Sequence, residues 1–360
     1  MADRIETYRS KPISLSAALL RDRSNTIRLL LCDLDEYVRK NPGPEFAEAR
    51  DPAWTDYRKI IRRLKEAGRS LEKALFRPDN PPSQELAIAL KELPPKAELN
   101  IYCSDQDVSL PFGFIFSGSN TYTHVNGQPS LNDFDDFWVN RFKITVSVEG
   151  GGCDSSNLNT DATHFRALYA LHKSELVAAV PYLGNSRERL KKLLKIEARD
   201  HYNWESAGRA WQKIRDKNNV VFVFAHSDGN WLELDDDHID CLSFYDLLSK
   251  NNTCYSTLLI LNCCLSASGS EGASLLSVVA RRGFCGLIGT EAEILNLYAL
   301  ACGTHLLWEL CAGGKTLGQA FDNMQNEARL FPLNLFYTCY ANRDFRLNTP
   351  ISQLVEKVAA

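Results

Sequence analysis

The feature that most constrains the fold is an apolar run that ends in two adjacent cysteines. Residues 258–261 read Leu-Leu-Ile-Leu, Asn262 follows, and the run stops at Cys263 and Cys264 before a small, polar segment. Four large apolar residues bounded by turn-forming residues are typical of a strand buried on both faces in a parallel sheet. The cysteines are then expected at the carboxyl edge of an α/β sheet, where such sheets place reactive side chains. They are either a nucleophile and its neighbour or two small buried apolar residues.

The composition is that of an ordinary globular protein. The chain has 360 residues, 44% hydrophobic and 24% charged, enough for two domains or one large domain with an extension. A net charge of −4 gives no indication of binding to nucleic acid or to an anionic membrane. Eleven cysteines, an odd number without a Cys-x-x-Cys pair, argue against a disulfide framework and a zinc cluster. This usage fits a reducing cytoplasm, and no cofactor or metal is expected.

No membrane segment is expected either. The first residues lack the apolar stretch of a signal peptide. The longest apolar segment, residues 295–312, contains His305 and Glu309 and is too short and too polar to span a bilayer. We therefore expect a cytoplasmic protein without a membrane partner.

The first quarter of the chain has helical periodicity. Apolar residues recur every three to four positions over residues 25–40 and 54–76, and a short third helix is predicted over 83–93. Pro-rich breaks separate these helices. The dense Arg and Lys of the second helix predict a solvated face or a docking surface. Residues 1–96 are therefore interpreted as one helical region.

From residue 97 the apolar period changes to two, and strands are predicted over 97–102, 110–116 and 137–148. Residues 97–156 are interpreted as a β-rich subdomain that ends in a Gly-rich connector.

Residues 157–348 alternate strands with helices, which predicts a mostly parallel sheet with crossover helices. The predicted strands cover residues 164–171, 219–225, 257–263, 284–289 and 333–340. The predicted helices cover residues 185–196, 205–216, 243–250, 271–280 and 293–311, and Thr316 is predicted to cap another. Residues 349–360 are interpreted as a C-terminal tail.

A cysteine nucleophile needs a base from elsewhere in the fold, and His226 meets that need. It directly follows one buried strand as Cys264 follows another, and the roughly 40 residues between them are enough for one crossover. Adjacent parallel strands lie roughly 5 Å apart, so the two side chains can meet above the sheet edge. The alternative is a core histidine, but residues 227–229, Ser-Asp-Gly, have the polarity of a loop. We therefore predict a His226–Cys264 dyad.

These segments resemble the CHAT proteases, bacterial caspase-like cysteine peptidases of the caspase–separase–gingipain group. Residues 221–226, Val-Phe-Val-Phe-Ala-His, look like the family's strand and histidine. Residues 261–267, Leu-Asn-Cys-Cys-Leu-Ser-Ala, look like its cysteine motif, with Cys263 where the family usually has alanine. The resemblance implies a caspase-like α/β sheet flanked by helices, with Cys264 as the nucleophile. Further similarity, in residues 110–114, 137–142, 283–291 and 333–337, extends it over most of residues 108–347.

The resemblance implies peptide-bond hydrolysis through a thioester. Cys264 attacks the carbonyl carbon, His226 protonates the leaving amine and then activates water, and backbone N–H groups near Ser227 and Cys264 hold the oxyanion. Family members usually have glycine directly after the histidine, whereas this chain places Ser227 and Asp228 before Gly229 and so departs from the family at the expected oxyanion hole. Asp228 either holds the imidazole positively charged or is a solvated loop residue.

Two acidic segments bear on specificity. In several relatives an acidic residue after the next strand lines the pocket for a basic P1 side chain, and Glu291 and Glu293 occupy the similar loop here. The resemblance thus implies cleavage after Arg or Lys; alternatively, both glutamates lie in the first turn of a helix, where acidic charge is favourable. Residues 235–237 are three consecutive aspartates, which do not converge on one calcium ion, so a solvated loop is predicted.

The resemblance also implies partners. Such proteases act on a protein substrate in regulated bacterial defence or cell death, held inactive until a partner engages them, and residues 1–95 are the candidate regulatory or docking segment. A catalytically silent caspase-like scaffold is the alternative, against which the pairing of His226 with a matching cysteine argues. A Rossmann-like nucleotide binder is disfavoured because the chain has neither a strand–GxGxxG–helix nor a GxxxxGK(S/T) pattern.

Overall fold

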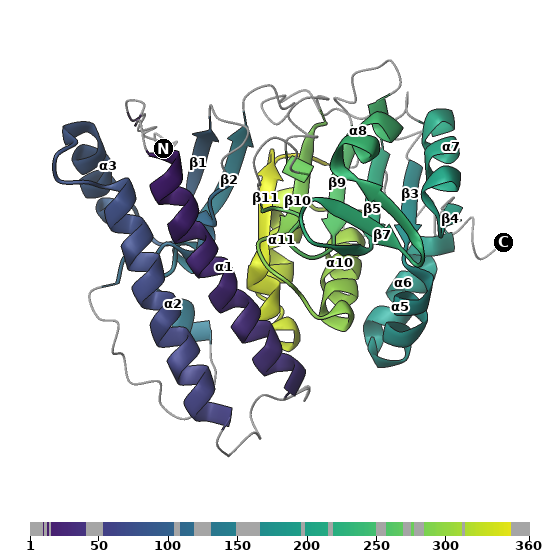
Figure 1. The fold of residues 1–360 in the computed structure, drawn as a ribbon, viewed down its shortest axis with the longest axis horizontal. Coiled ribbons are helices and arrows are strands. Elements are labelled where there is room, and N and C mark those ends of the chain that lie inside the picture. Colours follow the sequence, from purple (N-terminus) through teal and green to yellow (C-terminus); the bar gives the residue numbers. More distant parts are fainter. Residues whose placement is uncertain are drawn as a thin grey trace, which may run out of the picture.

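A computed structural model describes most of the chain (Figure 1). The described residues are 10, 13, 16–40, 53–103, 109–118, 131–148, 166–195, 199–214, 219–249, 257–268, 275–276, 284–311 and 314–346.

A six-stranded sheet forms the centre of the described structure, in the order β11-β10-β9-β5-β3-β4. Its strands are β3 (Arg166–Leu171), β4 (Arg199–His201), β5 (Asn219–Phe224), β9 (Thr257–Asn262), β10 (Gly286–Thr290) and β11 (Tyr337–Ala341). All neighbouring strands run parallel except β11, which is antiparallel to β10. Every residue of β9 and of β10 is buried, as expected for strands covered on both faces. The predicted α/β class, with a mostly parallel sheet flanked by helices, is confirmed.

The helices around this sheet form two packed groups. The helix α10 (Asn296–Cys311), most of whose side chains are buried, packs against α5 (Lys173–Ala179), α6 (Asn185–Lys195) and α11 (Leu317–Gln325). Helix α7 (Trp204–Ile214) instead packs against α8 (Cys241–Ser249) and strand β3.

Thr316 caps α11 as predicted, since its hydroxyl accepts the Gln319 N–H and the Gln319 side chain accepts the Thr316 N–H. No described helix has the length and apolar character needed to cross a bilayer.

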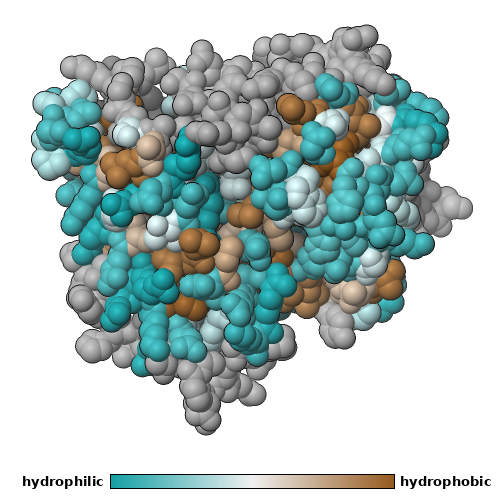
Figure 2. All heavy atoms as spheres, in the orientation of Figure 1, coloured by the Kyte–Doolittle hydropathy of each residue, from teal (hydrophilic) through white to brown (hydrophobic). Residues whose placement is uncertain are grey.

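The N-terminal helices are confirmed. Helices α1 (Ala17–Lys40) and α2 (Ala53–Leu75) lie side by side, and α3 (Pro81–Glu92) follows (Figure 1). Their predicted apolar stripes are buried, including Ile27, Leu31, Leu34, Tyr57, Leu64 and Leu71. Figure 2 shows hydrophilic residues intermingled with smaller hydrophobic areas over this part of the surface. The basic residues of α2 are exposed as predicted, except Arg69 and Lys65. Arg69 is half-buried, and Lys65 is buried with its Nζ 5.7 Å from the centroid of the Phe116 ring.

Residues 97–148 contain less strand than predicted. Strands β1 (Ala97–Cys103) and β2 (Phe142–Val148) form a parallel pair of their own. Residues 110–116, predicted as a strand, instead form the short 3-10 helix η2 (Phe112–Phe114) and a single bridge from Phe116 to Phe137. The alternation misleads because every residue of the run except Gly113 is buried: Ile115, between two buried phenylalanines, is fully inaccessible. Residues 138–141, predicted as strand, form the short helix α4 (Trp138–Arg141).

Three further differences concern the second half of the chain. Residues 333–336 form the 3-10 helix η8 (Leu333–Phe336) before β11 begins. A small antiparallel sheet of β6 (His226–Ser227), β7 (Trp231–Leu234) and β8 (Asp237–Asp240) was not predicted. Of the helix predicted over 271–280 only Leu275 and Leu276 are described, and the Gly-rich connector and the C-terminal tail lie outside the described residues.

Candidate active site

The register of two parallel strands places His226 and Cys264 at one edge of the sheet. In β5 and β9, Phe224 is the Cα partner of Asn262. His226 and Cys264 each follow two residues after this pair, so both leave the sheet at its carboxyl edge and from neighbouring strands. The two loops also approach each other, because a Cβ atom at Gly229 would lie 3.0 Å from Ser268 Oγ. Gly229 has φ +91°, which favours glycine here.

Asn262 fixes the end of β9. Its side chain is fully buried, its Nδ2 donates to Ala299 O at 2.7 Å, and its Oδ1 accepts from the hydroxyl of Tyr337. Both partners lie on elements that follow β10, so this polar side chain ties the strand before the cysteines to α10 and β11. A buried amide with both groups satisfied holds one orientation, which determines where the next two residues leave the sheet.

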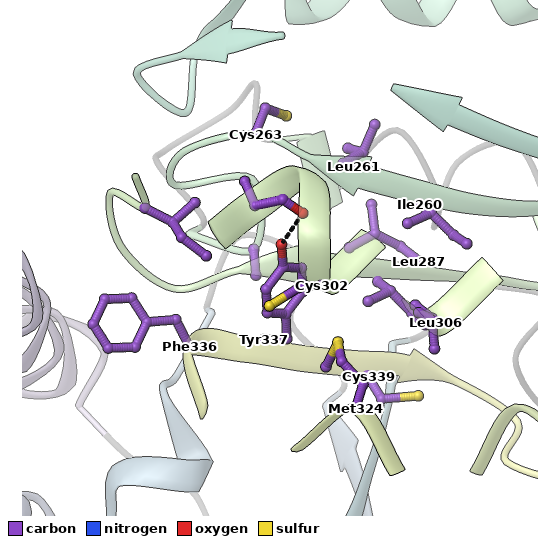
Figure 3. Packing of buried hydrophobic residues seen from close by; sticks show 14 of the residues in the cluster. Ile260, Leu261, Cys263, Leu287, Cys302, Leu306, Met324, Phe336, Tyr337 and Cys339 are labelled. Carbon is purple, nitrogen blue, oxygen red and sulfur yellow. Dashed lines mark hydrogen bonds between the residues drawn. The ribbon is translucent and has the colours of Figure 1, made fainter. Parts of the chain in front are cut away.

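The two cysteines have different surroundings. Cys263 is 2% exposed and packs in the apolar core, and burial raises the pKa of its thiol well above the usual range (Figure 3). Cys264 is half-buried, with its Sγ 3.5 Å from the donating N–H of Ile294 and 3.8 Å from the Ile294 carbonyl oxygen. Of the two, only Cys264 is partly exposed.

Several charges act on the Cys264 thiol. Burial raises its pKa to about 11; the Ile294 N–H opposes this rise, and the nearby carboxylates of Glu293 and Asp35 add to it. Arg39, which donates to Asp35 at 2.5 Å, favours the thiolate. At neutral pH the thiol is therefore protonated, and a reaction at this sulfur needs a base.

The loop that carries Cys264 is held rigidly. Leu265 has φ +55°, a strained conformation for leucine. Its N–H donates to Ala292 O at 3.2 Å, and the Ala267 N–H donates to Thr290 O at 2.9 Å. The Thr290 hydroxyl in turn donates to the Cys263 carbonyl oxygen at 2.7 Å. The end of β10 thus fixes the backbone on both sides of Cys264.

His226 has an acidic partner that the sequence analysis missed. Its Nε2 lies 3.4 Å from Oε1 of Glu175, on α5, and its side chain is 37% exposed. The other carboxylate oxygen of Glu175 accepts from Nδ2 of Asn296, in the first turn of α10, at 2.6 Å. Glu175 is thereby held between the candidate base and α10. The sequence signal for Glu175 is its place in the first turn of a helix that follows a strand. That strand, β3, ends at the same sheet edge as β5.

The residues after His226 form a tight turn. Asp228 Oδ1 accepts the N–H groups of Asn230 and Trp231, at 2.8 and 3.2 Å, so its carboxylate serves the turn. The Ser227 hydroxyl accepts the Gly229 N–H at 2.9 Å. The aspartates at 235–237 also bind backbone: Asp235 accepts from Lys173 and Ser174, and Asp237 accepts from Trp204.

The two glutamates of the candidate P1 pocket have different surroundings. Glu291 is completely buried; its Oε2 pairs with Arg28 of α1 at 3.0 Å, and its Oε1 accepts from the Thr338 hydroxyl at 2.8 Å. Both carboxylate oxygens are engaged, so the expectation that Glu291 binds a basic side chain of a substrate does not fit its position. Glu293 is exposed, and its charge acts on Cys264.

Helix α1 contacts the segment that surrounds the thiol. Besides the Arg28–Glu291 pair, Asp35 Oδ1 accepts the N–H of Leu295 at 2.7 Å. The N-terminal helical region therefore holds residues 291–295, against which the Cys264 sulfur lies.

The comparisons with known proteins give a similarity of backbone alone. No protein-family model matches the sequence, and no curated protein matches it significantly. The crystal structure of the Arg-specific cysteine proteinase gingipain R aligns over 82% of this chain and 77% of its own, with 9% identity and a TM-score of 0.47. A second structure, described as a protease, aligns over 81% and 68%, with 9% identity and a TM-score of 0.39. At these values no residue role is transferred.

Proposed function

We propose that this chain is a cysteine endopeptidase with His226 and Cys264 as its catalytic dyad. The observation that carries the proposal is the β5–β9 register, which brings a half-exposed histidine and a half-buried cysteine to the same sheet edge. The CHAT-protease resemblance of both segments supports the same roles.

In the proposed reaction His226 accepts the proton of Cys264, and Sγ attacks the carbonyl carbon of the peptide. The oxyanion that forms is held by backbone N–H groups near Ser227 and Cys264. His226 then gives its proton to the leaving amine, which breaks the C–N bond and leaves a thioester. Water, deprotonated by His226, attacks the thioester and releases the acid product and the thiol. The Ile294 N–H, which already donates to Sγ, stabilises the thiolate in the first step.

The experiment that tests this function is cleavage of a peptide library by the wild-type chain and by His226→Ala. Cleavage that falls by about 100-fold in the variant supports the proposal. Equal cleavage by both proteins, or none by either, contradicts it. A catalytically silent scaffold is the second candidate, favoured by one observation, the raised pKa of Cys264.

Glu175→Gln is expected to lower the cleavage rate by about tenfold, because the neutral amide stabilises the imidazolium of His226 less than the carboxylate does. Steady-state kinetics on the best library peptide measure this effect. Glu188→Gln removes the same charge from α6, where Glu188 pairs with Lys191 in solvent, and serves as the control with less than a twofold effect. A Glu175→Gln variant as active as this control would remove Glu175 from the site.

Glu293→Gln is expected to weaken a preference for Arg or Lys at P1, because Glu293 is the exposed carboxylate beside the thiol. The P1 profile of Glu291→Gln is expected to match that of the wild type, since Arg28 and Thr338 already bind that carboxylate. Library profiles of both variants decide the point. An unchanged profile for Glu293→Gln removes the idea that it recognises a basic side chain.

The N-terminal helices are proposed to regulate the site in a cytoplasmic protease that acts on a specific protein partner in bacterial defence or cell death. Their contacts support a regulatory role: α1 binds residues 291–295 through Arg28 and Asp35. A regulatory protein that displaces α1 would change the surroundings of the thiol directly.

A further inference from the structure

A second histidine packs against the candidate base. The rings of His172 and His226 meet edge to face, with centroids 4.6 Å apart and an interplanar angle of 78°. His172 lies between β3 and α5, and its N–H donates to the carbonyl oxygen of Phe224 at 2.7 Å. Phe224 ends the strand that leads to His226. The His172 side chain is 7% exposed, so this ring has little freedom to move away from its neighbour.

The His172 ring is also anchored through its Nδ1 atom. Its Nδ1 lies 3.2 Å from Asp235 Oδ1 and 3.2 Å from Ser174 Oγ, and the Glu175 N–H points to the same nitrogen at 3.5 Å. Asp235 is itself fixed, because its carboxylate accepts two backbone N–H groups and the Ser174 hydroxyl at the start of α5.

Asp235 and His226 also belong to one piece of structure. Asp235 lies in the turn between β7 and β8, and β7 pairs with β6, where Glu233 is the Cα partner of His226. His172 therefore contacts both the turn, through Asp235, and the candidate base.

Four charged or titratable groups face the His172 ring: His226, Asp235, Glu175 and Glu233. Burial lowers the pKa of His172, and so does the charge of His226, while the three carboxylates oppose the shift. His172 is therefore neutral at neutral pH and gains its proton only as the pH falls through its lowered pKa. Protonation then places a positive charge against the ring of His226.

We propose that His172, anchored by Asp235, is a positioning residue that holds the imidazole of His226 in its working orientation. The role rests on the proposed dyad. While His172 is neutral, its ring supports His226 beside Glu175. A proton on His172 places a positive charge against the ring of His226 and opposes the proton that His226 accepts from Cys264, so part of the acid limb of Cys264 reactivity follows His172.

The test is the rate of alkylation of Cys264 by iodoacetamide as a function of pH, quantified by mass spectrometry of the peptide that carries Cys264. Asp235→Asn is expected to move the acid limb to lower pH, because loss of the carboxylate lowers the pKa of His172 further. His172→Phe keeps the ring contact and is expected to retain more of the rate at neutral pH than His172→Ala, and its rate falls less toward acid pH than that of the wild type. His172→Ala is expected to lose about three- to tenfold of the rate at neutral pH, because the ring contact is gone. Four profiles that differ only by a scale factor would overturn the proposal, since a merely structural role does not move the limb.

A second measurement separates this proposal from the dyad. NMR titration of the His172 Cε1–H resonance reports its protonation without thiol chemistry. In His226→Phe the pKa of His172 is expected to rise, because the titratable neighbour that lowers it is gone; an unchanged value overturns the ring coupling. Alkylation that is insensitive to His226→Ala instead overturns the dyad, whatever the ring titration shows.

Discussion

Cys264→Ala is expected to abolish peptide cleavage, whereas Cys263→Ala keeps most of it. The difference follows from position: Cys264 is half-buried at the sheet edge, and Cys263 is packed in the core. Removing a covalent nucleophile lowers the rate by about 10³-fold or more. Removing the buried thiol affects stability, by about 1 kcal/mol. Initial rates on one library peptide, with circular dichroism to confirm folding, measure both effects. An inactive Cys263→Ala beside an active Cys264→Ala would reverse the assignment.

Arg28→Ala is expected to lower the free energy of unfolding by about 3 kcal/mol, because it leaves the carboxylate of Glu291 buried without its charge partner. Arg28 also donates to the carbonyl and the hydroxyl of Ser109, both at 3.1 Å, and these bonds are lost as well. Urea unfolding followed by circular dichroism gives the difference.

The matched control for this effect is Arg63→Ala. Arg63 lies on α2 and pairs with Asp33 of α1 at 3.5 Å, with both side chains about half exposed. Solvent screens this pair, so its loss is expected to cost less than about 1 kcal/mol. Equal losses in the two variants would show that the buried Arg28–Glu291 pair does not hold α1 on the sheet.

The strands that position the dyad could be predicted because their sequences are unambiguous. Residues 219–224 and 257–262 are almost uninterrupted apolar runs, and such runs are strands of a parallel sheet in this context. Their order in the chain then implied that His226 and Cys264 share an edge. In the structure β5 and β9 are neighbouring strands, and their register brings His226 and Cys264 to the same height at the sheet edge.

The surroundings of the dyad could not be predicted, because they depend on how distant segments meet. Glu175 and His172 reach His226 only after the β3–α5 connection has packed beside β5. Glu291 and Glu293 are two residues apart in one loop, yet Glu291 is buried and Glu293 is exposed. The buried one pairs with Arg28, which lies more than 250 positions earlier in the chain. The pattern of apolar and polar residues within a short stretch of sequence carries no information about such distant partners.

The failed strand over residues 110–116 has a similar cause. Alternating apolar residues predict a strand with one buried face. In residues 110–116, however, the large apolar side chains are all buried, and Phe114 is in edge contact with Phe137 and Phe336. The apolar composition of residues 110–116 therefore reflects burial and does not indicate a strand.

The most direct test of the dyad is labelling by a peptidyl chloromethyl ketone, with the modified residue identified by mass spectrometry. The predicted result is a single adduct on Cys264, formed about 100-fold more slowly in His226→Ala at unchanged thermal stability. An adduct on Cys263 or spread over the other cysteines, or equal labelling of Cys264 in His226→Ala, would contradict a dyad formed by His226 and Cys264.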